Sequence, residues 1–404
     1  MFVVPLTRDR RVLYVSTAVG ITAWAAALAW LAAALRPVES YLISYYVADY
    51  RFGFIRRGLA GELAGPIDDQ GFFLRATVLR WTVTALYLAI LLTLSVLVLR
   101  GGRSERRAMV ALVVPVLSFG VPFAVFSARP DLLGAAAVMA LAIGVAVRPR
   151  STPVWGAAYG AFTAVLALLH EAIPLEFPVG AVLAIYLLAP AMPGARRRLS
   201  ATLAVGPGLL AAVVVAVFGR RDTADLLCSQ VPHRQMPMMV SFKEFTHYLH
   251  TGQLRHQDYH GWVCRRYLPL YDSSALDGLS TVLGKGTGGL MFSLTAGAVG
   301  LAACIAAVQY LSGVSFFGFI SGLRGRWVAP LVALALMVPV FITGFDWTRW
   351  MLVIAFDITM VYLLYLRDRP ELDEPPTRRN VVGFVAIVVA FAALPLGLLP
   401  GGST

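Results

Sequence analysis

Apolar residues along the chain fall into long runs that short polar connections separate. A membrane-spanning helix needs about 20 consecutive apolar residues, and about eleven runs approach that length: 13–35, 75–99, 107–128, 131–148, 153–170, 175–192, 199–218, 287–310, 327–344, 347–366 and 380–399. We therefore predict an all-α polytopic transmembrane bundle of about eleven spans, with residues 1–404 as a single membrane domain. The shorter apolar run at 312–321 is interpreted as a re-entrant turn.

The connections between the runs alternate in charge. Arginines precede the first run and cluster in every second connection: Arg8, Arg10 and Arg11; Arg100, Arg103, Arg106 and Arg107; Arg148 and Arg150; Arg196, Arg197 and Arg198; Arg324 and Arg326; Arg367, Arg369, Arg378 and Arg379. Cytoplasmic loops carry an excess of basic residues, so the N-terminus is predicted to be cytoplasmic and the C-terminus extracytoplasmic. The first run is longer than the roughly 7–15-residue core of a signal peptide, which favours a retained span.

Two connections are long, and the same alternation predicts that both are extracytoplasmic. They are the first loop, residues 36–74, and the large loop, residues 219–286. Loops of this length usually carry function or small elements of their own, and we expect short helices at 59–67 and 242–254. Cys228 and Cys264 both lie in the large loop. On an oxidising side of the membrane they are expected to form a disulfide.

Composition excludes a soluble protein. Of the 404 residues, 58% are hydrophobic and 14% are charged, whereas a soluble domain has about 25% charged residues. The net charge of +12 does not indicate a nucleic-acid partner, because the basic residues lie in short clusters between apolar runs. Only Lys243 and Lys285 are lysines, so the abundance of arginine is not by itself evidence for phosphate binding.

Ionisable residues gather at four places, and the predicted topology puts all four on the extracytoplasmic side. The first is the stretch 49–58, with Asp49, Arg51, Arg56 and Arg57 among aromatic residues. Its ordinary explanation is an interfacial loop whose arginine side chains extend to the aqueous surface. The second is Arg129-Pro130-Asp131 between two spans, which helix capping and an ion pair would explain.

The third place is His170-Glu171 at the end of the run 153–170, where a buried structural pair is the ordinary explanation. The fourth holds Asp346, Trp347 and Arg349 at the start of the run 347–366. An intrahelical ion pair and an aromatic belt would explain these. Placing an ionisable residue at the end of a span costs free energy, so such a residue is first considered as a candidate for function. Four such groups on one face predict a shared site, in which arginines bind phosphate and carboxylates act as bases or stabilise charge.

Histidines are concentrated in the large loop. Five of the six lie there: His233, His247, His250, His256 and His260. Two pairs, His247 with His250 and His256 with His260, have the spacing of metal ligands on a helix. Asp258 is the nearest candidate for a further ligand. No obvious third ligand completes a set, so we predict a solvated or lid-like loop rather than a metal site.

The four groups together resemble a class of bacterial polytopic membrane enzymes. The motifs are Gly-Phe-Ile-Arg-Arg-Gly at 53–58, Arg-Pro-Asp at 129–131, His-Glu-x-x-Pro at 170–174 and Asp-Trp-x-Arg-Trp at 346–350. They are similar to GT-C glycosyltransferases and O-antigen polymerases. The chain departs from the better-known members in having no acidic pair directly after the first span and no large C-terminal soluble domain. The resemblance implies an inner-membrane enzyme with a polyprenyl-phosphate-linked sugar donor and a glycan or lipid acceptor.

The leading hypothesis is therefore a lipid-linked sugar transferase or polymerase of cell-envelope glycan synthesis. In it Asp49, or Glu171 assisted by His170, accepts a proton from the acceptor. Arginines bind the departing phosphate: Arg51, Arg56, Arg57, Arg129 and Arg349. Asp131, Asp346 and Trp347 support them, membrane lipids surround the protein, and a divalent cation is the one candidate cofactor. A flippase or transporter of an anionic lipid-linked glycan, and a non-catalytic envelope scaffold, are the other hypotheses.

Overall fold

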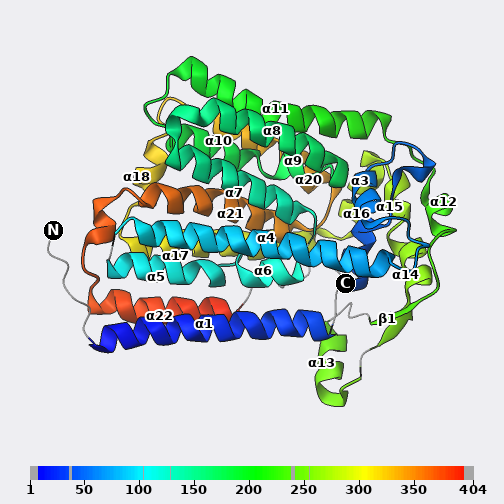
Figure 1. Cartoon of the computed structure of the whole chain (residues 1–404), viewed down its shortest axis with the longest axis horizontal. Coiled ribbons are helices and arrows are strands. Elements are labelled where there is room, and N and C mark those ends of the chain that lie inside the picture. The colour runs from blue at the N-terminus through cyan, green and yellow to red at the C-terminus, as the bar shows by residue number, and fades with distance from the viewer. Residues whose placement is uncertain are drawn as a thin grey trace.

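Figure 1 shows the computed structural model of the chain, which describes residues 8–35, 39–102, 104–127, 129–237, 242–253 and 255–394. Long helices lie side by side along the longest dimension of the molecule. The described residues contain one small antiparallel sheet, in which β1 (Gln235–Pro237) pairs with β2 (His256–Asp258). The all-α prediction is confirmed, with this hairpin as a local addition in the large loop.

The long and medium helices account for all eleven predicted runs. They are α1 (Arg8–Leu35), α4 (Phe72–Arg100), α5 (Glu105–Val113) with η3 (Val114–Val116) and α6 (Val121–Phe126), α7 (Asp131–Val147), α8 (Thr152–Leu169), α9 (Ile173–Glu176) with α10 (Pro178–Leu187), α11 (Gly194–Phe218), α17 (Thr287–Ser312), α19 (Val328–Ala335) with α20 (Val338–Thr343), α21 (Trp347–Leu366) and α22 (Arg378–Ala393). The last part of the predicted run 380–399 lies outside the described residues.

Shorter helices fill the connections. They are α2 (Glu39–Ile43), η1 (Ser44–Tyr46), η2 (Tyr50–Phe52), α3 (Gly58–Ala64), η4 (Pro149–Ser151), α12 (Ala224–Cys228), α13 (Phe242–Thr251), α14 (Tyr259–Arg266), α15 (Pro269–Asp272), α16 (Ala275–Gly284), α18 (Phe316–Ser321) and η5 (Pro370–Asp373). α3 and α13 lie where short helices were expected. α18 occupies the apolar run that was interpreted as a re-entrant turn.

Seven helices of the described chain are long and apolar enough to cross a membrane by length and composition. They are Arg8–Ala34, Phe72–Arg100, Glu105–Phe126, Pro149–Leu169, Gly194–Phe218, Thr287–Ser312 and Trp347–Leu366. Three shorter apolar helices, Asp131–Val147, Pro178–Leu187 and Val328–Thr343, lie among them. Prolines break several of the runs, which is why their helices are short. Multiple crossings are thus supported, while the count of eleven and the orientation stay predictions.

α21 lies at the centre of the bundle and is mostly buried, whereas α1 and α11 expose most of their apolar side chains. Close packing rests on small residues. A Cβ added at Gly297 of α17 would collide with Met351 of α21, and one at Gly160 of α8 would collide with the Leu203 carbonyl of α11. Small residues let apolar helices approach closely where water provides no driving force. Exposed apolar residues such as Val217 of α11 suit contact with lipid.

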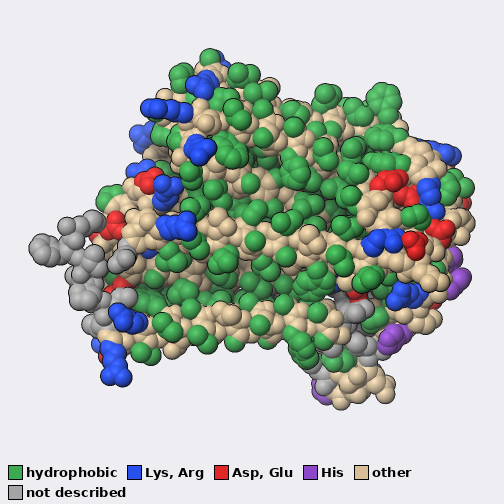
Figure 2. Space-filling model, viewed as in Figure 1, with side chains coloured by type: hydrophobic (Ala, Val, Ile, Leu, Met, Phe, Trp, Pro, Cys, Tyr) green, Lys and Arg blue, Asp and Glu red, His purple; other side chains and the backbone are tan. Residues whose placement is uncertain are grey.

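The two ends of the bundle differ in charge. Figure 2 shows a broad apolar band with basic side chains gathered at one end and mixed acidic, basic and histidine side chains at the other. We call these the basic end, which carries η4, α18 and η5, and the loop end, which carries α2–α3 and the large loop (Figure 1). Arg107 at the basic end is buried and donates to Asp373 and to the Arg367 carbonyl, each at 3.0 Å. Arg107 therefore also links α5 to η5 and to the end of α21.

Candidate functional site

The first loop reaches the middle of the loop end through Arg57. This residue caps α3 in the left-handed region, at φ 64°, a conformation that costs a non-glycine residue about 1–2 kcal/mol. Its Nε and NH2 atoms both donate to the carboxylate of Glu171, each at 2.9 Å. Its NH1 lies 3.4 Å from the Tyr267 hydroxyl. The strained backbone thus places a guanidinium in a two-bonded pair with the connection that follows α8.

Glu171 is held as an anion by this pair. Burial acts to raise the pKa of Glu171, but the neighbouring charges, that of Arg57 foremost, and the hydrogen bonds from Arg57 together outweigh burial and hold that pKa well below its usual range. Arg56 NH1 lies 3.9 Å from Glu171 Oε1, and its guanidinium lies over the Tyr271 ring. Arg56 makes no hydrogen bond within the described residues. Both carboxylate oxygens of Glu171 accept hydrogen bonds from Arg57, so Glu171 is better suited to positioning Arg57 than to accepting a proton.

A second group of charges lies at the start of α7 and α21. Asp346 Oδ2 accepts hydrogen bonds from Arg129 NH1 and Arg349 Nε, both at 2.8 Å. Arg349 NH1 also donates to Asp131 and lies 3.7 Å from Glu176 Oε1. Three carboxylates therefore surround Arg349, which is buried. We call the eight residues of the two groups the ionic cluster: Arg56, Arg57, Arg129, Asp131, Glu171, Glu176, Asp346 and Arg349.

Tyr45 joins the two groups. Its buried ring lies 5.6 Å from the Arg57 guanidinium and 6.0 Å from that of Arg129. The His170 ring packs against it, with centroids 5.7 Å apart. Tyr41 is a second aromatic support, 5.1 Å from the Arg129 guanidinium. Cations are attracted to aromatic faces over such distances, so the tyrosines hold both guanidiniums without using their N–H donors.

Several buried polar atoms of this region lack a hydrogen-bond partner within the described chain. They are His170 Nδ1, both carboxylate oxygens of Glu176, Asp131 Oδ1 and Arg129 Nε. Buried polar groups are nearly always paired, and an unpaired one costs about 1–3 kcal/mol. Their concentration in one place is typical of a site that is completed by water or by a ligand.

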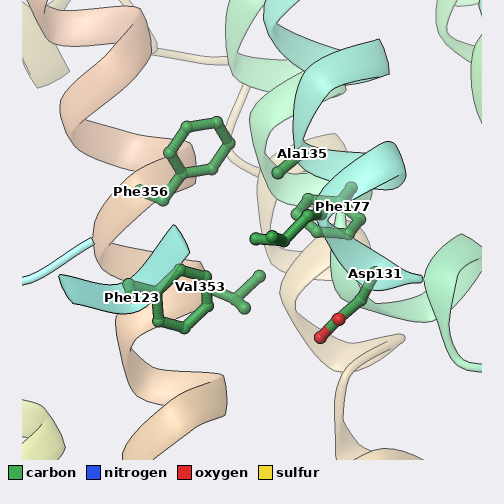
Figure 3. A pocket seen from close by; sticks show the side chains of 7 residues that line it. Phe123, Asp131, Ala135, Phe177, Val353 and Phe356 are labelled. Atoms are coloured by element: carbon green, nitrogen blue, oxygen red, sulfur yellow. The ribbon is translucent and has the colours of Figure 1, made fainter. Parts of the chain in front are cut away.

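An apolar pocket adjoins Asp131 on the side of the bundle interior. Figure 3 shows Asp131 beside Phe123, Phe177, Val353 and Phe356, and the pocket is also lined by Leu132 and Ala135. These side chains come from α6, α7, α21 and the turn between α9 and α10. Asp131 therefore places the ionic cluster next to an aromatic part of the core.

Asp49 and Arg51 form a separate pair. Asp49 is buried, caps η2 by accepting from the Arg51 backbone N at 3.1 Å, and binds Arg51 Nε at 2.7 Å. Arg51 NH1 also donates to Asp68 at 3.0 Å. No hydrogen bond or ion pair joins this pair to the ionic cluster within the described residues. Trp347 donates its indole N–H to the carbonyls of Phe341 and Gly344, so it fixes the turn before α21.

The two cysteines of the large loop form a disulfide, with the sulfurs 2.10 Å apart, which ties α12 to α14. His260 lies beside it, with Nε2 3.9 Å from Cys228 Sγ and Nδ1 donating to the Val231 carbonyl. Cys228, His260 and Cys264 are residues of the types that bind metal ions, and their possible ligand atoms lie within 4.8 Å of one another. Because both sulfurs are in the disulfide, they are not available as thiolate ligands. His247 and His250 lie on α13, away from this group in sequence and element.

Replacing both cysteines, Cys228→Ser with Cys264→Ser, is expected to destabilise the large loop by about 3–4 kcal/mol, because the disulfide closes a loop of 36 residues. Limited proteolysis of the detergent-solubilised protein should then cut within 219–286 at a lower temperature. Cys304→Ala, which leaves the disulfide intact, is the control. Equal cleavage of wild type with and without a reductant would contradict this expectation.

Sequence reasoning missed three members of the site. Glu176 was not among the predicted site residues, yet it faces Arg349. Tyr267 and Tyr271 lie four residues apart in the large loop and support Arg57 and Arg56. Their spacing puts both on one face of a short helical turn, which was the available signal. Nothing in the sequence indicated that this face meets the first loop.

Comparison with known proteins now places the chain. A family described as "Uncharacterised membrane protein Rv1490" matches residues 14–392. The protein belongs to the Rv1490 family of membrane proteins. "Uncharacterized protein Rv1490" of Mycobacterium tuberculosis (strain H37Rv) is 38% identical over 399 residues, which cover 97% of this chain and 92% of the relative. "Uncharacterized protein Mb1527" of Mycobacterium bovis matches to the same extent. No solved structure matches the chain.

This membership fixes the class of the protein more firmly than the motifs did. It is a multi-pass membrane protein, in agreement with the composition and the apolar helices. The match reaches from α1 to α22 and so includes both loops and every residue of the ionic cluster. The narrower likeness to GT-C enzymes receives no support from these comparisons, and it enters below only as a proposal.

Proposed function

We propose that this Rv1490-family protein is a glycosyltransferase of the bacterial inner membrane, which uses a polyprenyl-phosphate-linked sugar at the extracytoplasmic face. The observation that supports it is the convergence of four guanidiniums from three separate connections beside unpartnered buried polar atoms. Such a constellation suits a phosphate that carries an apolar chain, because the chain can stay in lipid while the arginines bind its charged end.

The arginines divide into two roles. Arg57 and Arg349 are committed to carboxylates, through two hydrogen bonds to Glu171 and through contacts with Asp131 and Asp346. Within the described part of the chain, Arg56 makes no hydrogen bond, and the Arg129 side chain donates through NH1 alone. Arg57 and Arg349 therefore shape the site. Arg56 and Arg129 offer N–H groups that can bind the phosphate of the sugar donor.

Transfer needs a proton acceptor and a stabilised leaving group. The acceptor hydroxyl loses its proton to Nδ1 of His170, which has no hydrogen-bond partner among the residues that the structure describes. Asp49 and Glu171 are instead held by arginines. The acceptor oxygen then bonds to the anomeric carbon as the bond from that carbon to the phosphate oxygen breaks. The polyprenyl phosphate leaves with the electron pair, and Arg56 and Arg129 stabilise its charge. A divalent cation is not required by this arrangement, because guanidiniums supply the positive charge.

The test is release of prenyl phosphate by the purified protein. A panel of prenyl-phosphate hexoses is incubated with a lipid extract of the host membrane as acceptor, and mass spectrometry measures prenyl phosphate. Arg56→Gln and Arg129→Gln are each expected to lower the rate about 100-fold or more, as loss of a charge-stabilising donor does in other enzymes. Arg324→Gln, an exposed arginine of the basic end, is the matched control. Equal rates in all four proteins would rule out the assigned site.

One observation favours transport as the second candidate. Asp357 lies fully buried in α21 and accepts a hydrogen bond from the Gly180 backbone N at 2.8 Å, while its Oδ1 has no partner in the described chain. Eight residues of helix at 1.5 Å each put it about 12 Å beyond Arg349. An acid at such depth is a feature of ion-coupled transporters. A protein that moves an anionic lipid-linked glycan would use it together with the ionic cluster.

A further inference from the structure

A second, separate cavity opens in the large loop. It has a volume of about 370 Å³ and is lined by Gln257 of β2 and by Trp262, Arg265 and Arg266 of α14. No carboxylate lines it, so its described walls carry two positive charges and no negative one. The volume lies within the 300–1,000 Å³ that small-molecule sites occupy.

The cavity is built on a braced scaffold. Asp258 caps α14 by accepting from the Gly261 backbone N at 3.1 Å, and the disulfide at Cys264 anchors the middle of the same helix. Arg265 Nε donates to the Gly261 carbonyl at 2.7 Å, which leaves its two terminal nitrogens for a ligand. Arg266 is exposed and makes no hydrogen bond within the described chain. Both guanidiniums are thus available from a fixed helix.

The lining chemistry selects a class of ligand. An indole offers an apolar face on which a sugar ring can lie, and guanidinium groups bind carboxylate or phosphate in a two-bonded fashion. The Gln257 side chain adds a donor and an acceptor for hydroxyls. We propose that this cavity binds an anionic sugar, one that bears a carboxylate or a phosphate.

The cavity also lies one aromatic layer from the ionic cluster. The Trp262 ring is 6.4 Å from that of Tyr41, which is 5.6 Å from Tyr45, and Tyr41 in turn supports Arg129. Tyr41 therefore lies between Trp262 and Arg129, and it links the cavity to the groups assigned to transfer. The role of this sugar as part of the acceptor glycan rests on the proposed function, whereas its binding does not.

Calorimetry on the purified full-length protein tests the binding directly. Glucuronic acid and glucose 1-phosphate are expected to bind at least about tenfold more tightly than glucose or inorganic phosphate, because each combines a ring with a charge. The double variant Arg265→Gln with Arg266→Gln, and separately Trp262→Leu, are expected to weaken this binding about tenfold to a hundredfold. Arg221→Gln, an exposed arginine of the same loop, should leave it unchanged.

Equal binding of glucose, equal binding of inorganic phosphate, or unchanged binding in the double variant would each overturn the proposal. Arg265→Lys with Arg266→Lys keeps the charge and should retain part of the affinity, which separates lost binding from lost folding. A preference for phosphatidylglycerol nanodiscs over both soluble sugars would identify a lipid headgroup instead and would also overturn it. Because no turnover is measured, a failed transfer assay leaves this result unaffected, and failed binding leaves the transfer result unaffected.

Discussion

Replacing Arg57 with alanine is expected to destabilise the protein by about 1–3 kcal/mol and to abolish sugar transfer. The variant leaves the half-buried Glu171 charged and without its two hydrogen bonds from Arg57, and a partly buried group that loses its partner carries a cost of that size. Transfer fails for a second reason, because Arg56 then becomes the nearest cation to Glu171 and is drawn away from the donor phosphate. Thermal unfolding in detergent measures the first effect, and prenyl phosphate release measures the second.

A paired variant separates stability from activity at this position. Arg57→Gln together with Glu171→Gln removes both charges, so it should recover much of the stability that either single change loses. It should not recover transfer, because the charge that positions Arg56 is gone. A wild-type melting temperature and a wild-type transfer rate in Arg57→Ala would show that the Arg57–Glu171 pair contributes neither to stability nor to transfer.

Replacing Arg349 with leucine is expected to be the most destabilising single change in the cluster. Arg349 contacts Asp131, Asp346 and Glu176. Its loss leaves three closely spaced carboxylates, of which Asp346 keeps Arg129 as an ion-pair partner. Loss of one partner of a buried pair costs about 3–5 kcal/mol, and like charges at short range add to it. The expected result is poor yield of folded protein and a lowered melting temperature by size-exclusion-based thermal assays.

Removal of one carboxylate should compensate in part. Arg349→Leu combined with Asp131→Asn leaves fewer uncompensated charges, so it should be more stable than Arg349→Leu alone. Arg326→Leu at the basic end, where the side chain is exposed, serves as the control and should change stability by less than about 0.5 kcal/mol. If Arg349→Leu melted like this control, the three contacts would contribute little to the fold.

Much of the architecture was readable from the chain because long apolar runs and alternating arginine clusters are local signals. Every predicted run contains helix, and the short helices α3 and α13 lie where they were expected. Helix interruptions were harder to place: Pro115 and Gly120 divide the run 107–128 into α5, η3 and α6. Whether such a broken helix still crosses a membrane depends on its neighbours, which sequence periodicity does not report.

The sequence indicated residues that lie together in the structure, but not how they pair. The structure brings together Arg57, Glu171, Arg129, Asp346 and Arg349, because each lies near a helix end and these ends meet. The separations are 114 residues for Arg57 with Glu171 and 217 for Arg129 with Asp346, and no local rule connects residues so far apart. Asp49 looked like a catalytic acid, but its side chain caps η2 and binds Arg51. A short polar stretch does not reveal which carboxylate has a local partner.

Chemical change to a donor, as opposed to its movement, tests the central claim most directly. The protein is reconstituted in sealed vesicles with a prenyl-phosphate hexose and a membrane lipid extract, and mass spectrometry follows both the intact donor and free prenyl phosphate over time. The account predicts that wild-type protein converts donor to prenyl phosphate and glycosylated product, and that His170→Gln and Arg129→Gln do not. Redistribution of intact donor across the membrane without release of prenyl phosphate would contradict it and would assign the ionic cluster to transport.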